Sequence, residues 1–361
     1  MSTSTSPVRT AIAGLGRSGW SIHARLLAEQ PERFTVVAVQ DHLAERRAEA
    51  EQRFGCRSHI EFDDLLADAE VELVVVAVPS HLHAPYAIAA LESGRHVVGE
   101  KPMATSLEEA ERMVAVRDAT GRLLSVFQNW RFRPELQKVL AIVGAGELGR
   151  LVQVRLVNHG FGRRWDWQTL RRFGGGSLNN TGAHLIDAAL TLFGPGEPRV
   201  LYVSDCVQTL GDAEDHLKVV LTPDPANADA AAAPTIDIEI TSTCAYEQPM
   251  LHVMGSEGGL VGGNGELTWR CVRPGSRPER QLSTEPTGDR SYNREQVDWV
   301  EHRWTLEEAK AAGGPEAEGE ARYYRELFGA IRHGGPLPVT AEQVLRQMRI
   351  MEECRRQSTI D

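Results

Sequence analysis

The sequence has few cysteines and no arrangement of them that would form a metal site or a disulfide framework. Its five cysteines are scattered without a Cys-x-x-Cys pair, at Cys56, Cys206, Cys244, Cys271 and Cys354. Such scatter is typical of reduced, structural thiols in a cytosolic enzyme. The twelve histidines include no His-Glu-x-x-His spacing, by which one helix face holds zinc. We therefore predict a protein without a bound metal.

The chain also lacks a long apolar run and an excess of positive charge. No segment of the 361 residues is long and apolar enough to span a bilayer, and Met1 to Pro7 lacks the apolar core of a signal peptide. The net charge of −11 opposes binding to nucleic acid or an anionic membrane surface. We expect a cytoplasmic protein whose substrate is a small molecule.

Two long regions differ in their hydrophobic pattern, and the length itself favours two domains. From residue 8 to about 128, apolar runs such as 34–40 and 71–78 alternate with amphipathic helical patterns, which is typical of a doubly wound parallel sheet. Beyond Pro134, alternating strands such as 151–157 and 236–243 indicate an antiparallel sheet with one covered face.

Three other segments carry predictions of their own. We expect a hairpin loop over 223–234 and an extended loop with short helices over 273–319. Helical patterns end the chain at 321–332 and 341–356.

A glycine fingerprint stands between the first strand and the first helix. Residues Gly14-Leu15-Gly16-Arg17-Ser18-Gly19 follow the apolar run 8–13 and open a helical pattern over 18–29. Gly14 permits a tight turn, Gly16 lets the backbone approach a pyrophosphate, and Gly19 allows close packing of helix on strand. The helix N-terminus adds N–H donors for the phosphates. This context predicts dinucleotide binding.

An acidic residue ends the second strand, roughly twenty residues beyond the fingerprint. The Asp41 carboxylate can accept both ribose hydroxyls of the adenosine half, and it repels the 2′-phosphate of NADP. Arg46 and Arg47 follow closely and could instead bind that phosphate. The sequence favours NAD as the cofactor and leaves NADP as the less favoured alternative.

Candidate ligand-binding residues also follow the remaining strands of the first region, at the edge where parallel sheets bind ligands. They are Pro79, Ser80 and His83 after one strand, Glu100 and Lys101 after the next, and Gln128, Asn129 and Arg131 after the last. We predict that the first six contact the cofactor and that Lys101, Asn129 and Arg131 contact the substrate. Lys101 precedes a proline, so the backbone aims its side chain at this crevice. An ammonium there can hold a substrate hydroxyl and stabilise developing negative charge.

A second constellation begins at the glycine run 174–176 and reaches His184. Asn180 and His184 are four residues apart and share a face if the segment is helical. An imidazole suits removal of a hydroxyl proton, although the residues alone equally allow a core histidine. Trp165 and Asp166 could line a carbohydrate site together with Asn129 and Arg131, or simply pack in a loop.

These motifs together resemble the Gfo/Idh/MocA family of oxidoreductases over almost the whole chain. The resemblance implies a Rossmann domain over residues 1–130 and a substrate-binding and oligomerisation domain over 131–361, with C-terminal helices that could pack back on the first domain. In fold class this is an α/β protein: a doubly wound parallel sheet, then an α/β domain with a large open, mainly antiparallel sheet. A homodimer or homotetramer packed through that sheet is also implied.

The resemblance assigns roles by position. Lys101 matches the catalytic lysine, and His184 matches the histidine credited with proton transfer. Asn180 stands where the usual dehydrogenases have aspartate, and an amide cannot raise the basicity of an imidazole by its charge. We expect this departure to affect alcohol oxidation more than ketone reduction.

The sequence thus predicts an NAD-dependent oxidoreductase that interconverts a secondary alcohol and a ketone on a sugar, cyclitol or related polyol. Lys101 would hold the reacting oxygen, His184 would move the proton, and Asn180 would orient a hydroxyl. Two alternatives stay open. One is a glycoside hydrolase that retains NAD and acts by transient oxidation, and the other is a non-catalytic sensor that binds dinucleotide.

Overall fold

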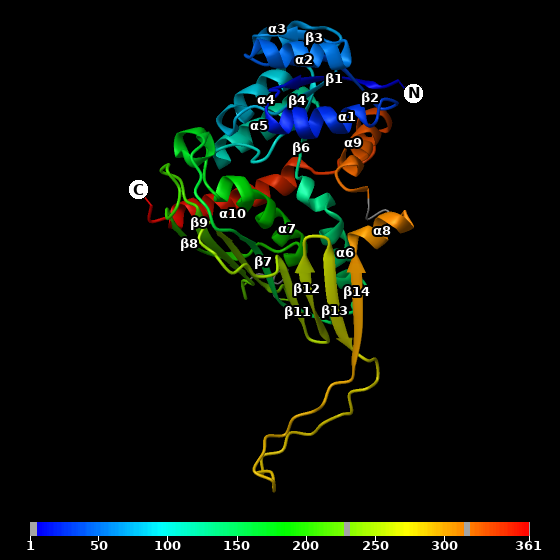
Figure 1. Ribbon diagram of the computed structural model, residues 1–361, viewed down its shortest axis with the longest axis vertical. Coiled ribbons are helices and arrows are strands. Elements are labelled where there is room, and N and C mark those ends of the chain that lie inside the picture. Colours follow the sequence, from blue (N-terminus) through cyan, green and yellow to red (C-terminus); the bar gives the residue numbers. More distant parts are fainter. Residues whose placement is uncertain (1–5, 227–231, 314–317, 361) are drawn as a thin grey trace.

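The computed structural model describes residues 6–226, 232–313 and 318–360 (Figure 1). Two sheets build the molecule, one from the N-terminal third of the chain and one from the remainder. Among the described helices, none is long and apolar enough to cross a bilayer. Residues 273–298 form a long loop without helix or strand that extends away from the second sheet (Figure 1).

The first sheet has six parallel strands in the order β3-β2-β1-β4-β5-β6. Its strands are β1 (Val8–Ala13), β2 (Phe34–Gln40), β3 (Arg57–His59), β4 (Leu73–Val76), β5 (His96–Gly99) and β6 (Leu124–Val126). The helices between them are η1 (Gly19–Ala24), α1 (Arg25–Ala28), α2 (Ala44–Phe54), α3 (Phe62–Ala67), η2 (Ser80–Leu82), α4 (His83–Glu92) and α5 (Leu107–Thr120). Strand order reverses between β1 and β4, the position at whose carboxyl ends doubly wound sheets generally bind their ligands.

Apolar β-branched residues explain the interior position of these strands. All four residues of β4 are valine or leucine and are fully buried, as a parallel strand covered on both faces requires. Helix boundaries follow local capping: Ser106 caps α5 by accepting the Glu109 amide, and Gly121 ends that helix in the left-handed conformation. The prediction of a doubly wound parallel sheet is confirmed.

The second sheet has eight strands in the order β14-β13-β12-β11-β7-β10-β9-β8. They are β7 (Leu151–His159), β8 (Arg199–Asp205), β9 (His216–Thr222), β10 (Thr235–Thr241), β11 (Leu251–Gly255), β12 (Gly258–Gly263), β13 (Glu266–Val272) and β14 (Trp299–Thr305). Neighbours are antiparallel except β7 and β10, which run parallel. The prediction of a mainly antiparallel sheet is therefore confirmed.

Helices cover one face of the second sheet. The elements outside the strands are η3 (Asn129–Phe132), α6 (Pro134–Gly144), η4 (Trp167–Thr169), η5 (Arg171–Phe173), η6 (Leu178–Gly182), α7 (Ala183–Phe193), α8 (Leu306–Ala312), α9 (Ala321–His333) and α10 (Ala341–Gln357). Helix α7 packs on β7 and β10, and α10 packs on β8 (Figure 1). Strands β9 and β10 accordingly alternate between buried and half-buried residues.

The two C-terminal helices return to the first sheet. Tyr323 and Tyr324 of α9 are fully buried, and the Tyr323 hydroxyl donates to Ser125 Oγ of β6 at 2.9 Å. Ser125 in turn donates to the Val339 carbonyl at 2.8 Å, just before α10. The Tyr324 ring packs edge-on against Phe34 of β2. The last part of the chain thus helps to build the core beneath the first sheet.

Of two predicted loops, one differs from the structure and the other lies partly outside the described residues. The prediction of loop and short helices over 273–319 is wrong for β14, which pairs with β13 from Glu266↔Thr305 to Val272↔Trp299. The strand itself contains Trp299, Val300 and Trp304, but it follows directly on the polar segment 273–298 and was included in the same predicted loop. Strands β9 and β10 do pair as expected, but residues 227–231 of the predicted hairpin loop lie outside the described residues.

Candidate active site

The glycine fingerprint forms a loop whose glycines are required for different steric reasons. Gly14 has φ +90°, and a Cβ there would lie 2.6 Å from the Ala77 carbonyl oxygen at the end of β4. A Cβ on Gly19 would lie 1.9 Å from the Gly14 carbonyl oxygen. Gly16 has no atom within 4 Å of that position. The backbone at Gly16 therefore faces open space where a pyrophosphate fits, with exposed Arg17 and half-buried Ser18 leading into η1.

Asp41 ties the fingerprint loop to the end of β2. Its carboxylate is only 4% exposed and accepts the Leu15 amide at 2.8 Å and the Leu43 amide at 2.9 Å. Arg46 Nη1 lies 3.4 Å from the carboxylate oxygen Oδ2, and Arg47 Nη1 donates to the backbone carbonyl of Asp41 at 2.8 Å. The acid thus holds a fixed position beside the open face at Gly16, as the adenosine ribose of a dinucleotide requires.

His83 joins two of the loops at the strand ends. Its Nδ1 lies 2.6 Å from the Pro102 carbonyl oxygen and its Nε2 lies 2.9 Å from the Val78 carbonyl oxygen. Burial lowers the pKa of this imidazole. Exposed Pro79 and buried Ser80 stand between these anchors, at the start of η2. His83 therefore fixes the loops, and its direct contact with a cofactor stays a prediction.

Glu100 is buried and oriented by two hydrogen bonds. His23 Nε2 lies 3.0 Å from Oε1, and the Lys101 amide donates to Oε2 at 3.0 Å. His23 Nδ1 lies 2.6 Å from the Tyr324 hydroxyl, so a chain of contacts runs from α9 to this loop. Burial works to raise the pKa of Glu100, but the bond to His23 and the charge of Lys101 bring it below its usual value. Glu100 is consequently a fixed anion beside Lys101.

The Lys101 side chain reaches from β5 to the second constellation. Its Nζ donates to Asn180 Oδ1 at 2.9 Å and to the Asn180 carbonyl at 3.2 Å. Burial lowers the pKa of Lys101; Glu100 opposes this shift, whereas Arg17 and Arg164 add to it. The structure thus brings together a lysine and an asparagine that are 79 residues apart in the chain.

His184 follows Asn180 by one helical turn and lies in α7. The residue is 9% exposed, and its ring stacks on the Trp130 indole with centroids 5.1 Å apart and planes 8° apart. Burial lowers the pKa of His184 well below 6.5, and the charges of Lys101 and Arg133 push it in the same direction. The imidazole is therefore neutral at neutral pH and able to accept a proton. Within the described chain, no polar group bonds its buried Nδ1.

The glycine run and η6 are held by long-range contacts that sequence reasoning missed. Glu214 Oε1 accepts the Leu178 amide at 2.8 Å, and a Cβ on Gly176 would collide with this carboxylate. Burial raises the pKa of Glu214. Asn179 accepts from Arg355 of α10 at 2.8 Å. No spacing pattern links these residues, since each contact joins elements that are distant in the sequence.

The predicted cofactor residue Gln128 and the predicted substrate residues Asn129 and Arg131, which follow β6, form hydrogen bonds with other protein groups. Arg131 makes a two-pronged ion pair with buried Asp187, at 2.6 and 2.7 Å. Asn129 Nδ2 donates to Glu320 Oε1 at 2.6 Å. Gln128 Nε2 likewise donates to Gln347 of α10 at 2.6 Å. These bonds give all three a positioning task in this structure, and their contacts with cofactor or substrate stay predictions.

Trp165 and Asp166 lie on an exposed loop beside the Lys101 pair. Trp165 is 75% exposed, and Asp166 accepts the Gln168 amide at 2.8 Å and Arg164 Nε at 2.7 Å. Gln168 Oε1 then accepts a long hydrogen bond of 3.4 Å from Asn180 Nδ2. Gln168 is a further residue that sequence reasoning missed. The loop therefore contacts the Lys101–Asn180 pair through the Gln168 side chain.

The fold and the strand-end site together define a two-domain, NAD-binding oxidoreductase. Residues 8–128 match the model of the oxidoreductase family's NAD-binding Rossmann fold, and residues 141–359 match its C-terminal alpha/beta domain. The chain belongs to the Gfo/Idh/MocA oxidoreductase family, as its motifs predicted.

The similarity to individual proteins extends over nearly the whole chain. It is 26% identical to an uncharacterized oxidoreductase, C115.03, of Schizosaccharomyces pombe, over 98% of this chain and 97% of that one. It is also 26% identical to scyllo-inositol 2-dehydrogenase (NADP(+)) IolW of Bacillus subtilis, over 96% and 92%. The fold matches the WlbA dehydrogenase of Bordetella pertussis, solved with NADH and UDP-GlcNAcA, with a TM-score of 0.73, 23% identity and 97% and 96% coverage.

Proposed function

We propose that this protein is an NAD-dependent oxidoreductase that interconverts a secondary alcohol and a ketone on a sugar, cyclitol or related polyol. The observation that carries the proposal is the contact of 2.9 Å between Lys101 Nζ and Asn180 Oδ1, with His184 one turn away. This cluster lies at the strand ends beside the loop that fits the dinucleotide. NAD, when bound, supplies the acceptor or donor of the hydrogen at the reacting carbon.

Lys101 is placed to hold the reacting oxygen of the substrate. Its hydrogen-bond partners at Nζ are the side-chain amide oxygen and the carbonyl oxygen of Asn180, and the Glu100 anion beside it favours its charged form. A protonated lysine in this partly buried place stabilises an oxygen that gains negative charge as the hydroxyl proton leaves. Asn180 thus acts by aiming Lys101 and by offering its own amide to a neighbouring hydroxyl.

His184 is placed to take the hydroxyl proton during alcohol oxidation. A neutral imidazole can accept this proton at neutral pH, whereas ketone reduction needs a protonated group to give one. Because the pKa of His184 lies well below 6.5, the imidazole is unprotonated and free to receive this proton, although its burial and the charges of Lys101 and Arg133 make it a weaker base than a free histidine.

NAD is favoured over NADP by the surroundings of Asp41. A 2′-phosphate would meet a carboxylate that is fixed by two backbone amides. The two arginines that could bind a phosphate both contact Asp41 in this structure. The Bacillus subtilis relative IolW is named for NADP(+), so cofactor choice varies among the relatives of this chain.

Polyols are favoured as substrates by the relatives and by the exposed loop. IolW acts on scyllo-inositol, and WlbA was solved with a nucleotide sugar. The indole face of Trp165 is available to stack on the C–H face of a sugar ring, and Asn180 and Asp166 offer polar groups nearby.

A homodimer or homotetramer is favoured by the uncovered face of the second sheet. Exposed apolar side chains there include Val152, Leu201 and Val203. A second copy of the chain would shield them from water. Sedimentation of the purified protein tests this assembly.

The function is tested with the purified protein and a panel of compounds. NAD⁺ is incubated with cyclitols and aldoses, and NADH with ketoses, while the absorbance of reduced nicotinamide is recorded. Turnover of one compound class is the expected result. Cofactor that co-purifies firmly, without any net change in NADH, contradicts the proposal and favours the NAD-retaining hydrolase or the sensor.

A further inference from the structure

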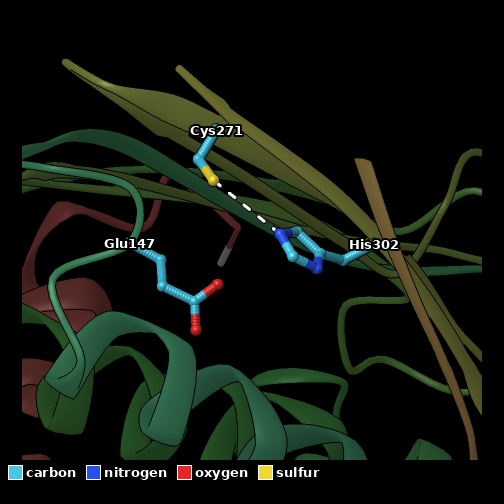
Figure 2. Close-up of side chains that lie close together, drawn as sticks. All are labelled: Glu147, Cys271 and His302. Atoms are coloured by element: carbon cyan, nitrogen blue, oxygen red, sulfur yellow. Dashed lines mark hydrogen bonds between the residues drawn. The ribbon is translucent and has the colours of Figure 1, made fainter. Parts of the chain in front are cut away.

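Three side chains with metal-binding chemistry converge at the helix-covered face of the second sheet, near its β13–β14 edge. Glu147 lies in the turn between α6 and β7, Cys271 on β13, and His302 on β14 (Figure 2). All three are half-buried. Two further strands, β11 and β12, separate this edge from β7, on which the active-site helix α7 packs. The cluster is therefore distinct from the Lys101 site.

The distances suit a single small cation. One ligand atom from each residue lies within 4.8 Å of the other two, and Cys271 Sγ is 3.9 Å from His302 Nε2. In tetrahedral zinc, bonds of about 2.3 Å to sulfur and about 2.0 Å to nitrogen place these atoms roughly 3.6 Å apart. A small side-chain adjustment closes the difference, and Figure 2 shows the three groups facing one shared space.

Trp269 orients two of the three groups. Its indole Nε1 donates to Glu147 Oε2 at 2.7 Å, which leaves Oε1 for a ligand. The same indole stacks on the His302 ring, with centroids 4.9 Å apart and planes 16° apart. Partners of this kind hold first ligands in the geometry that a metal needs. The cluster thus has suitable ligand atoms and a neighbouring side chain that orients two of the ligands.

The charge and softness of the ligands select the metal. A thiolate, a carboxylate and a neutral imidazole carry two negative charges, which balance a divalent cation. Lys138 Nζ, 5.7 Å from the Trp269 ring centroid, opposes a cation, and the two anionic ligands offset it. Sulfur and imidazole ligands together favour zinc over magnesium or calcium. Three protein ligands at a half-buried place leave a fourth position for water.

We propose that Glu147, Cys271 and His302 bind one Zn²⁺ ion, which fastens the β13–β14 edge to the turn after α6. This proposal departs from the sequence-based prediction of no metal. That prediction relied on short spacings, whereas these ligands come from a turn and two strands that only the fold brings together.

The test uses the full chain, freed of metal by a chelator. Zn²⁺ binding is measured by competition with a chromophoric chelator, and Co²⁺ is used as a spectroscopic substitute. We expect one ion per chain and a thiolate-to-cobalt absorption band of a tetrahedral site. Cys271→Ser should remove the band and weaken Zn²⁺ binding at least about a hundredfold, and Trp269→Phe should weaken it about tenfold. Cys206→Ser, a half-buried cysteine outside the cluster, is the matched control and should change neither.

Three results overturn the proposal. They are Zn²⁺ binding no tighter than millimolar, a Co²⁺ spectrum without the thiolate band, and unchanged binding in Cys271→Ser. If that variant fails to fold, which circular dichroism will reveal, the Co²⁺ spectrum of the unaltered chain decides the question alone. Zn²⁺ should also raise the unfolding temperature of the parent protein and not that of His302→Gln.

Discussion

The cofactor side and the substrate side of the candidate site are built in different ways. On the cofactor side, Gly14, Asp41 and Glu100 each follow a buried strand directly and bond to backbone or buried groups close by. On the substrate side, Asn180 and Trp165 lie on a short helix and an exposed loop, which are held through distant partners. A fixed cofactor side and an adjustable substrate side let one fold accept different substrates while the chemistry stays in place.

Lys101 joins the two sides, so its removal should have the largest effect. We expect Lys101→Ala to lower kcat at least about a hundredfold, because the reacting oxygen loses its cationic partner. NAD binding, measured by fluorescence titration, should stay within about twofold, since the fingerprint loop is untouched. Lys310→Ala, an exposed lysine on α8, is the control. Normal turnover of Lys101→Ala contradicts the assigned role.

His184 tests the substrate side alone, and we expect His184→Asn to lower kcat about a hundredfold. The pH profile carries the sharper information. With a pKa well below 6.5, His184 stays a base as the pH falls through 6.5, so kcat/KM for oxidation should decline only at lower pH. The pKa of Lys101 is lowered from 10.5, so this lysine should lose its proton below pH 10.5 as the pH rises. The loss of its charge should lower kcat/KM on the alkaline side of the pH profile.

The His184→Asn variant separates the acid side of the kcat/KM profile from its alkaline side. His184→Asn should lose the acid limb and keep the alkaline one, which a purely structural defect would not produce. The lowered pKa of His184 also sets how the stability of the folded protein changes with pH. The histidine of the unfolded chain takes up a proton near pH 6.5, whereas the histidine of the folded protein does not. Below pH 6.5 this residue therefore reduces stability, and a profile that rises on acidification would contradict the assignment.

Asp41 tests the cofactor side. Asp41→Ser should raise the KM for NAD about tenfold, because charge-assisted hydrogen bonds to the ribose are lost. It should also improve the use of NADP, since the repelling carboxylate is gone and Arg46 is freed from it. Initial rates with both cofactors measure the change, and Glu45→Ser at the start of α2 serves as the control. An unchanged ratio of the two rates would count against Asp41 as the selector.

Trp165 should show the smallest effect, confined to substrate binding. We expect Trp165→Ala to raise the substrate KM about threefold to tenfold with little change in kcat, because a stacked ring contributes about 1 kcal/mol. The KM for NAD should not move. Trp165→Phe should restore most of the loss, which distinguishes stacking from an indirect effect on the loop. A fall in kcat without a change in KM would place Trp165 outside the substrate contact.

The features that depend on short stretches of sequence were predicted well. Strand β1, the fingerprint and the acid that ends β2 follow one another closely, and short-range patterns are sufficient to identify them. Edge strand β14 was missed because it follows directly on the long polar segment 273–298. The family and its fold class followed from motifs, which confirms that motifs carry information about the whole chain.

Side-chain partnerships lay beyond sequence reasoning. Asn180 was considered as a neighbour of His184, but its Oδ1 accepts from Lys101 instead. The supports of the candidate site, Glu214, Gln168 and Trp130, reach it from other elements. Such contacts depend on how two sheets and their helices pack, and no periodicity in the chain encodes that packing.

The chain of contacts from Tyr324 through His23 to Glu100 has a consequence for how the protein is made. During synthesis, the ribosome releases Glu100 long before it releases α9. The first sheet can form early, but Tyr324 reaches His23 only when synthesis is nearly finished. This contact therefore waits for α9, and a chain that ends before α9 lacks the hydrogen bond between Tyr324 and His23 that orients the partner of Glu100.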